Sequence, residues 1–443
     1  MSDEQRRFVE HVTSDCQVAA GVGMAGTGKS FALRAGNAAW QAAGHEVVGC
    51  ALAGKAAAGL EEGSGIKSQT LHSLLAELDS GNRTLSSKSV VVLDESGMVG
   101  VHQMSSLVEH VSKAGAKLIM VGDSRQLQPV EAGAPFRQIC EKIGAAELSD
   151  IRRQHNEADR TAVKQLAAGR AAEALDFFKS EGRLKVASTR KETMRDMVSD
   201  YLRQRDPLHP GESLMIAATR SETHKLNSLA RQLLGEQLGP GTTVETPHGP
   251  REFCEGDRVL FTRNSKSLGV KNGTLGTLER VEIGRDAPTF RVRLDDGNTI
   301  QFQPGEDWKA GQYSDLDHAY CVTAHKSQGA TVDRAYVLSP DGMGGREWAY
   351  VALSRHRDEA HLYAAADQVE DLADMLSQER QAVAALDHSL DHEIDEQEKI
   401  LDEMSVTQEQ QELESESAAQ ATPAPALEPV QEPSSHEPEI EIE

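Results

Sequence analysis

Apolar residues in the first third of the chain follow two alternating patterns. Short continuous apolar runs, each of strand length, occupy residues 17–22, 90–93 and 117–121. Between them lie stretches such as residues 31–43, in which apolar residues recur at the spacing of an amphipathic helix. Strand-like runs that alternate with helical stretches over residues 2–133 predict an α/β fold built on a parallel sheet.

The pattern changes between residues 242 and 313, where short apolar runs alternate with polar residues. These runs lie at residues 257–261, 273–277, 290–294 and 299–302, with turn residues between the last two at 295–298. Five or so strands at this spacing predict a small β-barrel of SH3-like type, inserted at residues 239–313.

After residue 366 the composition becomes acidic. Residues 368–404 keep a helical spacing of Leu and Met, which predicts an acidic helical extension over residues 369–404. Residues 418–443 are rich in Pro, Glu, Ser and Ala and have too few apolar residues to bury a core. We therefore expect a disordered acidic tail over residues 405–443.

The net charge must be divided along the chain before it is interpreted. It is −24 overall, but residues 387–443 hold 18 Asp and Glu and one Lys, a net charge of −17. Residues 1–386 hold 52 acidic and 45 basic residues, a net charge of −7. A body with this balance has no electrostatic signature of nucleic-acid binding, so such a function must rest on local residues.

Other features of the composition exclude several protein classes. With 443 residues the chain is long enough for two to four domains. It has no N-terminal apolar segment of signal-peptide type and no apolar run of about 18 residues, so we expect a cytoplasmic protein without a membrane span. Its five cysteines are scattered without C-x-x-C spacing, which argues against a disulfide framework or a metal site.

The most informative motif is Gly-Met-Ala-Gly-Thr-Gly-Lys-Ser at residues 23–30, which fits the P-loop pattern G-x-x-x-x-G-K-[ST]. Its glycines let backbone N–H groups turn inward around phosphates at the start of the following helix. Lys29 is expected to reach the β- and γ-phosphates and Ser30 to ligate Mg²⁺. The predicted ATP contacts are Gly23, Met24, Ala25, Gly26, Thr27, Gly28, Lys29 and Ser30.

A pair of acids, Asp94 and Glu95, follows the apolar run of residues 90–93, about 65 residues after the P-loop. The carboxyl end of a buried parallel strand is where an α/β fold places its chemistry. Asp94 is expected to hold Mg²⁺, and Glu95 to orient or deprotonate the attacking water. Beyond the next predicted strand, Gln126 is a candidate contact for the γ-phosphate.

Several segments together resemble the motifs of superfamily 1 DNA helicases of the RecD-like branch. Residues 122–130 are similar to the third motif, residues 147–154 to the fourth, residues 323–329 (Thr-Ala-His-Lys-Ser-Gln-Gly) to the fifth and residues 350–357 (Tyr-Val-Ala-Leu-Ser-Arg-His-Arg) to the sixth. Details of the second half, including residues 268–276, look closest to the helicase part of TraA-type conjugative relaxases. The resemblance covers about residues 2–366.

One departure from the TraA-type pattern limits what can be carried over. Those relaxases have an N-terminal nicking domain with a catalytic Tyr and a histidine metal cluster, whereas this chain starts at the helicase part and contains no His-x-His cluster. We therefore do not predict DNA nicking. We expect a stand-alone helicase, or a fragment or relative without the relaxase half.

The resemblance implies two RecA-like P-loop motor domains. The first would span residues 1–145, and the second residues 146–238 and 314–368, interrupted by the SH3-like insertion. Residues 78–88 occupy the place where relatives insert a β-hairpin pin that splits duplex DNA. Leu78 or Leu85 is a candidate wedge there, and a plain connecting loop is the alternative.

The resemblance also implies roles at the nucleotide. Gln5 matches the glutamine that reads the adenine edge, with a surface role as the alternative. Gly329 belongs to the fifth motif and is assigned to the nucleotide site. Arg153 and Arg355 match the arginines that reach the γ-phosphate from the second motor domain, and Arg152 is an alternative to Arg153.

Contacts with single-stranded DNA are implied in both motor domains. The matching residues are Lys55, Thr70 and His72 in the first domain and Thr323, His325 and Lys326 in the second. Short donors and one Lys per domain suit phosphate contacts without base reading. In the insertion, the loop with Lys266 and Lys271 is either a further phosphate contact or a solvated face.

These expectations favour a monomeric, ATP- and Mg²⁺-dependent motor that acts on single-stranded DNA and tailed duplex DNA, and the resemblance implies 5′-to-3′ movement. One alternative is an adapter of a conjugation or recombination complex that binds DNA and ATP without unwinding. Another is an RNA helicase or remodelling ATPase. The acidic tail is solubilising, competes for the DNA channel or docks a protein partner.

Overall fold

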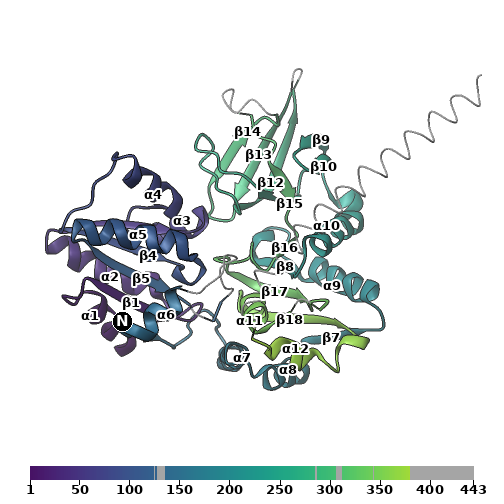
Figure 1. Cartoon of the computed structure of the whole chain (residues 1–443). Helices are drawn as coiled ribbons and strands as arrows, with labels where there is room; N and C mark the ends of the chain where they lie inside the picture. The colour runs from purple at the N-terminus through teal and green to yellow at the C-terminus, as the bar shows by residue number, and fades with distance from the viewer. Residues whose placement is uncertain (124, 127–134, 285–286, 306–311, 343, 380–443) are drawn as a thin grey trace, which may run out of the picture. The chain divides into compact units, whose positions relative to one another are not determined.

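Two parallel sheets and an antiparallel β subdomain form the framework of the protein (Figure 1). The computed structural model describes residues 1–123, 125–126, 135–284, 287–305, 312–342 and 344–379. All three parts belong to one compact unit. The predicted tail at 405–443 lies outside the described residues, as does the predicted helical extension from residue 380 onward, and before that point the chain forms α12 (Leu372–Ser377).

The first sheet has six parallel strands in the order β3-β2-β4-β5-β1-β6. The strands are β1 (Val18–Gly23), β2 (Glu46–Ala51), β3 (Ser68–Thr70), β4 (Ser89–Asp94), β5 (Lys117–Gly122) and β6 (Ala146–Leu148). The accompanying helices are α1 (Asp3–Val12), α2 (Lys29–Ala42), α3 (Gly54–Ser64), α4 (Leu71–Asp79), α5 (Val101–Ala114) and α6 (Pro135–Ile143). Because the strands are parallel, the carboxyl ends of β1, β4 and β5 lie at one edge of the sheet. The parallel α/β fold predicted for this region is confirmed.

Helix α1 shows how the sequence sets a helix start and its buried face. The Ser2 hydroxyl accepts a hydrogen bond from the Gln5 backbone N–H at 3.3 Å, and the Gln5 side chain accepts one from the Ser2 N–H at 3.1 Å, which completes a capping box. Phe8 and Val12, four residues apart on one face, are fully buried. Phe8 packs on Gly21 of β1, where an added Cβ would lie 2.2 Å from the ring.

We expect Gly21→Ala to destabilise the fold by about 1–3 kcal/mol, because the new methyl group must displace the Phe8 ring in a packed core. Gly59→Ala is the matched control, since a Cβ at Gly59 in α3 meets no atom within 4 Å. Thermal unfolding followed by circular dichroism measures both. Equal melting temperatures for the two variants would contradict the packing argument.

The second sheet has five parallel strands in the order β16-β8-β17-β18-β7. The strands are β7 (Leu184–Ala187), β8 (Ser213–Ala217), β16 (Cys321–Thr323), β17 (Val332–Leu338) and β18 (His356–Ala365). The helices of this part are α7 (Glu157–Ala167), α8 (Ala171–Ser180), α9 (Arg190–Gln204), α10 (Arg220–Leu234) and α11 (Arg346–Leu353). Strand β8 is buried throughout, and β17 is apolar and buried over its last four residues, as expected for central strands of a parallel sheet.

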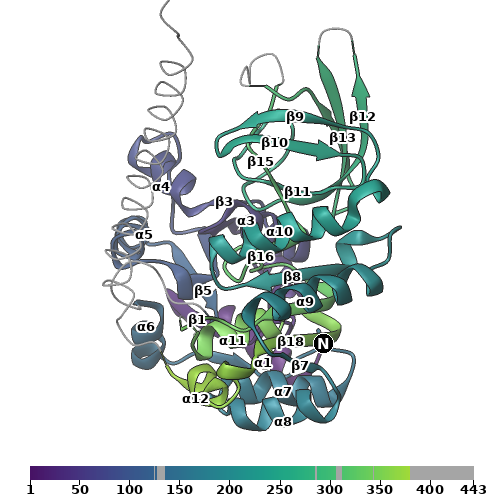
Figure 2. The same ribbon diagram turned by 90° about the vertical axis from the view of Figure 1, so that its right-hand side faces the viewer.

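An antiparallel β subdomain lies in the sequence between α10 and β16, so it interrupts the second sheet. Its sheet has the order β14-β13-β12-β11-β15, and β9 and β10 form a separate hairpin beside α10 (Figure 2). The strands are β9 (Gly241–Thr246), β10 (Gly249–Cys254), β11 (Arg258–Phe261), β12 (Leu275–Ile283), β13 (Pro288–Leu294), β14 (Thr299–Phe302) and β15 (Leu316–His318). Val244 and Phe253 of the hairpin share one apolar core with this sheet.

Buried polar contacts lie both within the subdomain and between it and the second sheet. Arg258 at the start of β11 is 1% exposed and donates to both carboxylate oxygens of Asp295, at 2.6 and 2.7 Å. The Tyr320 hydroxyl, next to β16, donates to Asp257 at 2.7 Å, and Arg231 of α10 donates to the same carboxylate at 3.0 Å. The two bonds to Asp257 therefore connect the start of β11 to the second sheet and to α10, and removing a partner of such a buried charge is costly.

Two details differ from the sequence-based expectations. Strand β6 follows residue 145, where we expected the second domain to begin, yet it pairs in parallel with β1 of the first sheet. A strand of three residues carries too weak a periodic signal to be assigned to a sheet in advance.

The expected β-hairpin pin at residues 78–88 is wrong for this structure. Residue 78 lies in the last turns of α4, and no strand begins before β4 in this fully described stretch. Leu78 is 8% exposed, and Leu85 packs against the same apolar core, so neither presents an apolar wedge. The structure has the alternative, a connecting loop.

In the part of the chain that the structure describes, every helix is too short or too polar to cross a lipid bilayer.

Candidate functional site

The P-loop joins β1 to α2 at the carboxyl edge of the first sheet. Gly26 and Gly28 have φ values of 79° and 84°, a region that residues with a Cβ rarely adopt. Gly28 is the N-cap of α2, and no side chain caps this helix end. The first N–H groups of α2 are therefore available to an anion at the positive end of the helix dipole.

Gly26 is also required because another segment passes directly over it. An added Cβ at Gly26 would lie 2.4 Å from the Cβ of Arg153. The Arg152 N–H donates to the Gly26 carbonyl at 2.8 Å, which ties the segment between the two sheets to the P-loop. The P-loop backbone thus lies against the residue that we expected to reach the γ-phosphate.

The Lys29 side chain is hydrogen-bonded to the backbone of its own P-loop in this structure. Its Nζ donates to the carbonyl oxygens of Gly23, at 2.8 Å, and Met24, at 3.3 Å. These bonds hold the ammonium group beside the loop, where phosphate oxygens can replace the carbonyls as acceptors.

β4 ends at Asp94, and Glu95 follows it with a strained backbone. Burial, and next the charge of Glu95, raise the pKa of Asp94 to about 6, against a lowering effect of Lys29. Glu95 has φ 50° and ψ 37°, and among the described residues it is the one non-glycine with positive φ. Strain of this kind concentrates at functional sites, where it aims a side chain.

The raised pKa of Asp94 predicts that Asp94→Asn stabilises the fold above about pH 6. The unfolded carboxyl ionises near its ordinary pKa of 3.8, so between about pH 4 and pH 6 ionisation increasingly favours the unfolded state. Removing the charge should therefore add roughly 1–3 kcal/mol at pH 8 and nothing at pH 4. Melting temperatures across this range measure the gain, and a gain of the same size at pH 4 would contradict the assignment.

Two arginines, partly buried Arg153 before α7 and buried Arg355 after α11, line one cavity with the P-loop. Arg153 donates to the carbonyl of Ser354 at 2.9 Å, and Arg355 donates to the carbonyl of Val351 and the hydroxyl of Ser354, both at 2.8 Å. Burial, and next the charge of Arg355, lower the pKa of Arg153 to about 9. Burial also lowers the pKa of Arg355. Two like charges held together by neutral acceptors form a site for a multivalent anion.

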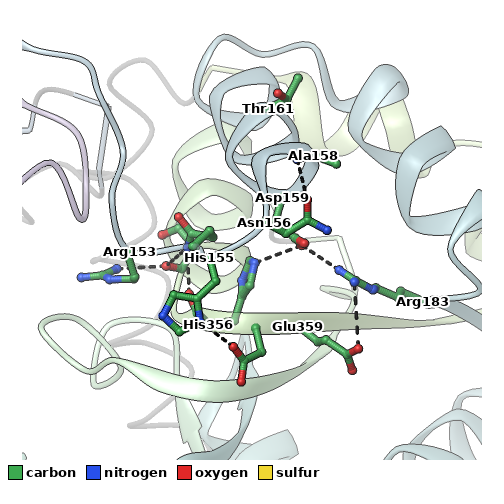
Figure 3. Close-up of polar contacts among 12 residues, drawn as sticks. Arg153, His155, Asn156, Ala158, Asp159, Thr161, Arg183, His356 and Glu359 are labelled. Atoms are coloured by element: carbon green, nitrogen blue, oxygen red, sulfur yellow. Dashed lines mark hydrogen bonds and ion pairs between the residues drawn. The ribbon is translucent and has the colours of Figure 1, made fainter.

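A network of polar contacts connects the segment that follows Arg153 with the strand that begins at His356 (Figure 3). Gln154 donates to the carbonyl oxygens of Ser354 and His356, at 3.2 and 2.8 Å. Fully buried His356 contacts Asp159 of α7 at 3.2 Å, and Arg183 donates to the same Asp159 oxygen at 2.7 Å. The strand that follows Arg355 is thus clamped to the segment that follows Arg153.

A third group joins the P-loop to α11. The Tyr350 hydroxyl accepts from the Ala25 N–H at 2.7 Å and donates to Asp123 at 2.7 Å. Gln126 donates to the same Asp123 oxygen at 3.1 Å. Neither Tyr350 nor Asp123 was among our predicted site residues. The available signal was a Tyr within the otherwise apolar residues 348–353, because a buried phenol needs a hydrogen-bond partner.

One cavity of about 780 Å³ brings most of the predicted residues together. From the predicted nucleotide site it is lined by Ala25, Gly26, Thr27, Gly28, Lys29, Ser30, Asp94, Glu95, Gln126, Arg153, Gly329 and Arg355. From the predicted DNA contacts it is lined by Lys55, Thr70, His72, His325 and Lys326, and the β subdomain adds Asn264, Asn272 and Gly273. Gly23, Met24, Gln5 and Thr323 do not line this cavity.

Several predicted residues have local partners. The Gln5 amide donates to the Thr27 carbonyl at 3.3 Å and accepts from the Ser2 N–H at 3.1 Å, so it contacts the P-loop directly with both ends engaged. Thr70 caps α4 by accepting from the Ser73 N–H at 3.2 Å. Thr323 accepts from the Lys326 N–H at 3.3 Å.

Burial lowers the pKa of both lysines assigned to DNA. For Lys55, Asp295 acts in the opposite direction, and for Lys326, Asp317 does so. Both lysines contact the cavity, and a lysine that is partly desolvated gains more from an incoming phosphate than one in water.

Comparison with known proteins supports the reading of this site. Residues 1–189 match the family model described as an AAA domain. A probable conjugal transfer protein TraA from Sinorhizobium fredii is 39% identical over 88% of this chain and 35% of its own length. The conjugal transfer protein TraA of Agrobacterium fabrum is 39% identical over 82% of this chain and 32% of its own length. An ATP-dependent RecD2 DNA helicase from Deinococcus radiodurans is 28% identical over 81% of this chain and 48% of its own length.

Solved structures share the fold at low sequence identity. Pif1 helicase from Candida albicans has a TM-score of 0.58 and 21% identity, and covers 88% of this chain and 99% of its own. Bacteroides Pif1 bound to single-stranded DNA has a TM-score of 0.55 and 20% identity, and covers 81% of this chain and 91% of its own.

The chain spans about a third of the length of the TraA proteins that it matches. Over 82–88% of its own length, however, this chain is 39% identical to these relatives. Residues 1–189 thus match an AAA domain, most of the chain is similar to the TraA conjugal transfer proteins and to an ATP-dependent RecD2 DNA helicase, and the chain shares its fold with Pif1 helicases.

Proposed function

We propose that this chain is an ATP-driven DNA motor that is stimulated by single-stranded DNA and unwinds tailed duplex DNA in the 5′-to-3′ direction. The observation that carries the proposal is the cavity in which Lys29 of the P-loop meets Arg153 and Arg355. Cations from two separate sheets around one P-loop suit a nucleotide whose γ-phosphate holds the sheets together, so that hydrolysis moves them apart.

ATP and Mg²⁺ fit the groups present. Buried Asp94 and partly buried Glu95, beside Lys29, suit a divalent cation, and Ser30 at the start of α2 adds a hydroxyl oxygen. When bound, Mg²⁺ neutralises charge on the β- and γ-phosphates. Asp94 and Ser30 would hold it, Glu95 would accept a proton from the attacking water, and Gln126 would sense the γ-phosphate.

The architecture proposed for this motor has a first RecA-like domain at residues 1–145 extended by β6, and a second at residues 149–238 and 314–368. The β subdomain between them in sequence is of the SH3-like type. Its Asn264 and Asn272 join Lys55 and Lys326 at the cavity, which supports a path for a DNA strand along this side. The 5′-to-3′ direction rests on the kinship with RecD-type helicases alone.

The names of the relatives suggest conjugative DNA transfer as the setting. A non-unwinding ATPase subunit of a conjugation or recombination complex is the second candidate, and the connecting loop in place of a pin favours it. An intact set of Lys29, Glu95, Arg153 and Arg355 around one cavity favours the motor.

Strand displacement on duplexes with either a 5′ or a 3′ single-stranded tail tests the proposal. We expect unwinding only with the 5′ tail, and none with Lys29→Ala. Stimulated ATP hydrolysis without displacement would support the adapter, and unwinding only from a 3′ tail would overturn the proposed polarity. Equal stimulation of hydrolysis by RNA and DNA of one sequence would overturn the DNA preference.

A further inference from the structure

Tyr350 occupies an unusual place in the molecule. It belongs to α11 of the second sheet, five residues before Arg355, yet its hydroxyl is bonded to two groups of the first sheet. The side chain is fully buried in a small apolar cluster with Met24, Ala25 and Ile151. Two members of this cluster, Met24 and Ala25, belong to the P-loop itself.

The hydroxyl makes a directional chain of hydrogen bonds. The Ala25 N–H donates to it at 2.7 Å, and the hydroxyl donates onward to Asp123 at 2.7 Å. Burial, and next the charge of Asp123, raise the pKa of Tyr350 well above its usual value, so the phenol keeps the proton that it donates.

The chain continues to a residue at the cavity. The Asp123 oxygen that accepts from Tyr350 also accepts from the Gln126 amide at 3.1 Å, and the other oxygen accepts from the Arg125 N–H at 3.1 Å. Asp123 is 3% exposed and follows β5 directly. A buried carboxylate that loses one of these donors is left under-satisfied, so the position of Gln126 depends on Tyr350.

We propose that Tyr350 is a positioning residue that couples the P-loop and Gln126 to the helix leading to Arg355. This rests on the proposed ATPase function. Because α11 ends two residues before Arg355, a shift of that arginine on loss of the γ-phosphate moves the Tyr350 hydroxyl relative to Ala25 and Asp123. Through the hydrogen-bond chain, this movement changes the positions of both the P-loop and Gln126.

Tyr350→Phe tests the coupling because it removes only the hydroxyl and keeps the ring in its apolar cluster. Tyr336→Phe is the matched control: Tyr336 is equally buried, lies in β17 of the same sheet and donates to Gln204 at 2.9 Å, far along the chain from the P-loop. A second test variant, Asp123→Asn, changes the acceptor of the chain.

The first readout is amide hydrogen exchange of the peptide that contains Ala25. We expect it to exchange about tenfold faster in Tyr350→Phe than in the wild type, and no faster in Tyr336→Phe, because the Ala25 N–H loses its acceptor. This measurement needs no turnover, so it decides the structural part of the proposal even if the chain proves not to hydrolyse ATP.

The second readout is steady-state hydrolysis with single-stranded DNA. We expect kcat to fall about tenfold in Tyr350→Phe with KM for ATP changed less than threefold, and the double variant with Asp123→Asn to be no worse than the more affected single variant. Additive losses, a change in KM alone or an effect matched by Tyr336→Phe would overturn the coupling. Inactivity of the wild type would instead count against the proposed function.

Discussion

Arg355→Ala is expected to lower kcat for DNA-stimulated ATP hydrolysis by about a thousandfold or more. An arginine that stabilises charge on the transferring phosphoryl group supplies effects of this size. In this structure Arg355 is 1% exposed, shares the cavity with Lys29 and Glu95, and bonds only neutral acceptors among the described residues. Its charge is therefore free to act on a phosphate. Hydrolysis assays at saturating ATP and DNA measure kcat for the variant and the wild type.

The controls separate loss of the charge from loss of the fold. Arg357→Ala removes a half-exposed arginine two positions away, paired with Asp333 at 2.6 Å, and should leave kcat within about threefold. Arg355→Lys keeps a charge but loses the planar fork, so it should remain at least about tenfold impaired. Full activity of Arg355→Ala, with a wild-type melting temperature, would remove Arg355 from the catalytic group.

Features encoded over short stretches of sequence could be predicted. The P-loop needs only eight consecutive residues, and its glycines have the positive φ values that the motif demands at Gly26 and Gly28. The apolar run before Asp94 forms a fully buried parallel strand, because such a run has no stable place outside a core. The resemblance to a family then located Arg153 and Arg355, which neither periodicity nor charge could have connected to the P-loop.

Features that depend on contacts between distant segments could not be predicted. Tyr350 and Ala25 are 325 positions apart, and nothing local to either residue indicates the partner. Strand β6 is too short to show a period, and its place beside β1 is decided by the sheet. At residues 78–88 the resemblance implied a pin, with a connecting loop as the alternative, and the structure has the loop, because α4 continues to Asp79 and the next strand begins only at Ser89.

The nucleotide site combines three arrangements that oppose folding in the absence of a ligand. Arg153 and Arg355 repel each other, Asp94 and Glu95 do the same, and Glu95 has a backbone conformation that other residues avoid. A bound nucleotide with its metal ion would supply opposite charge to both pairs. Affinity for the ligand and instability of the empty site therefore have the same origin.

Glu95→Gln is expected to lower kcat by about a hundredfold to ten-thousandfold while ATP still binds, because the amide keeps the shape of the side chain but cannot accept a proton from water. Binding of a non-hydrolysable ATP analogue should change less than threefold. The charge of Glu95 is one cause of the raised pKa of Asp94, so the variant should also melt at a higher temperature at pH 8. A stable, nucleotide-binding and inactive protein would place the lost function in the chemical step.

Asp94→Asn, in contrast, should raise the Mg²⁺ concentration needed for half-maximal activity. If Glu95→Gln instead shifted the Mg²⁺ requirement and left kcat intact, Glu95 would be a metal ligand rather than the base.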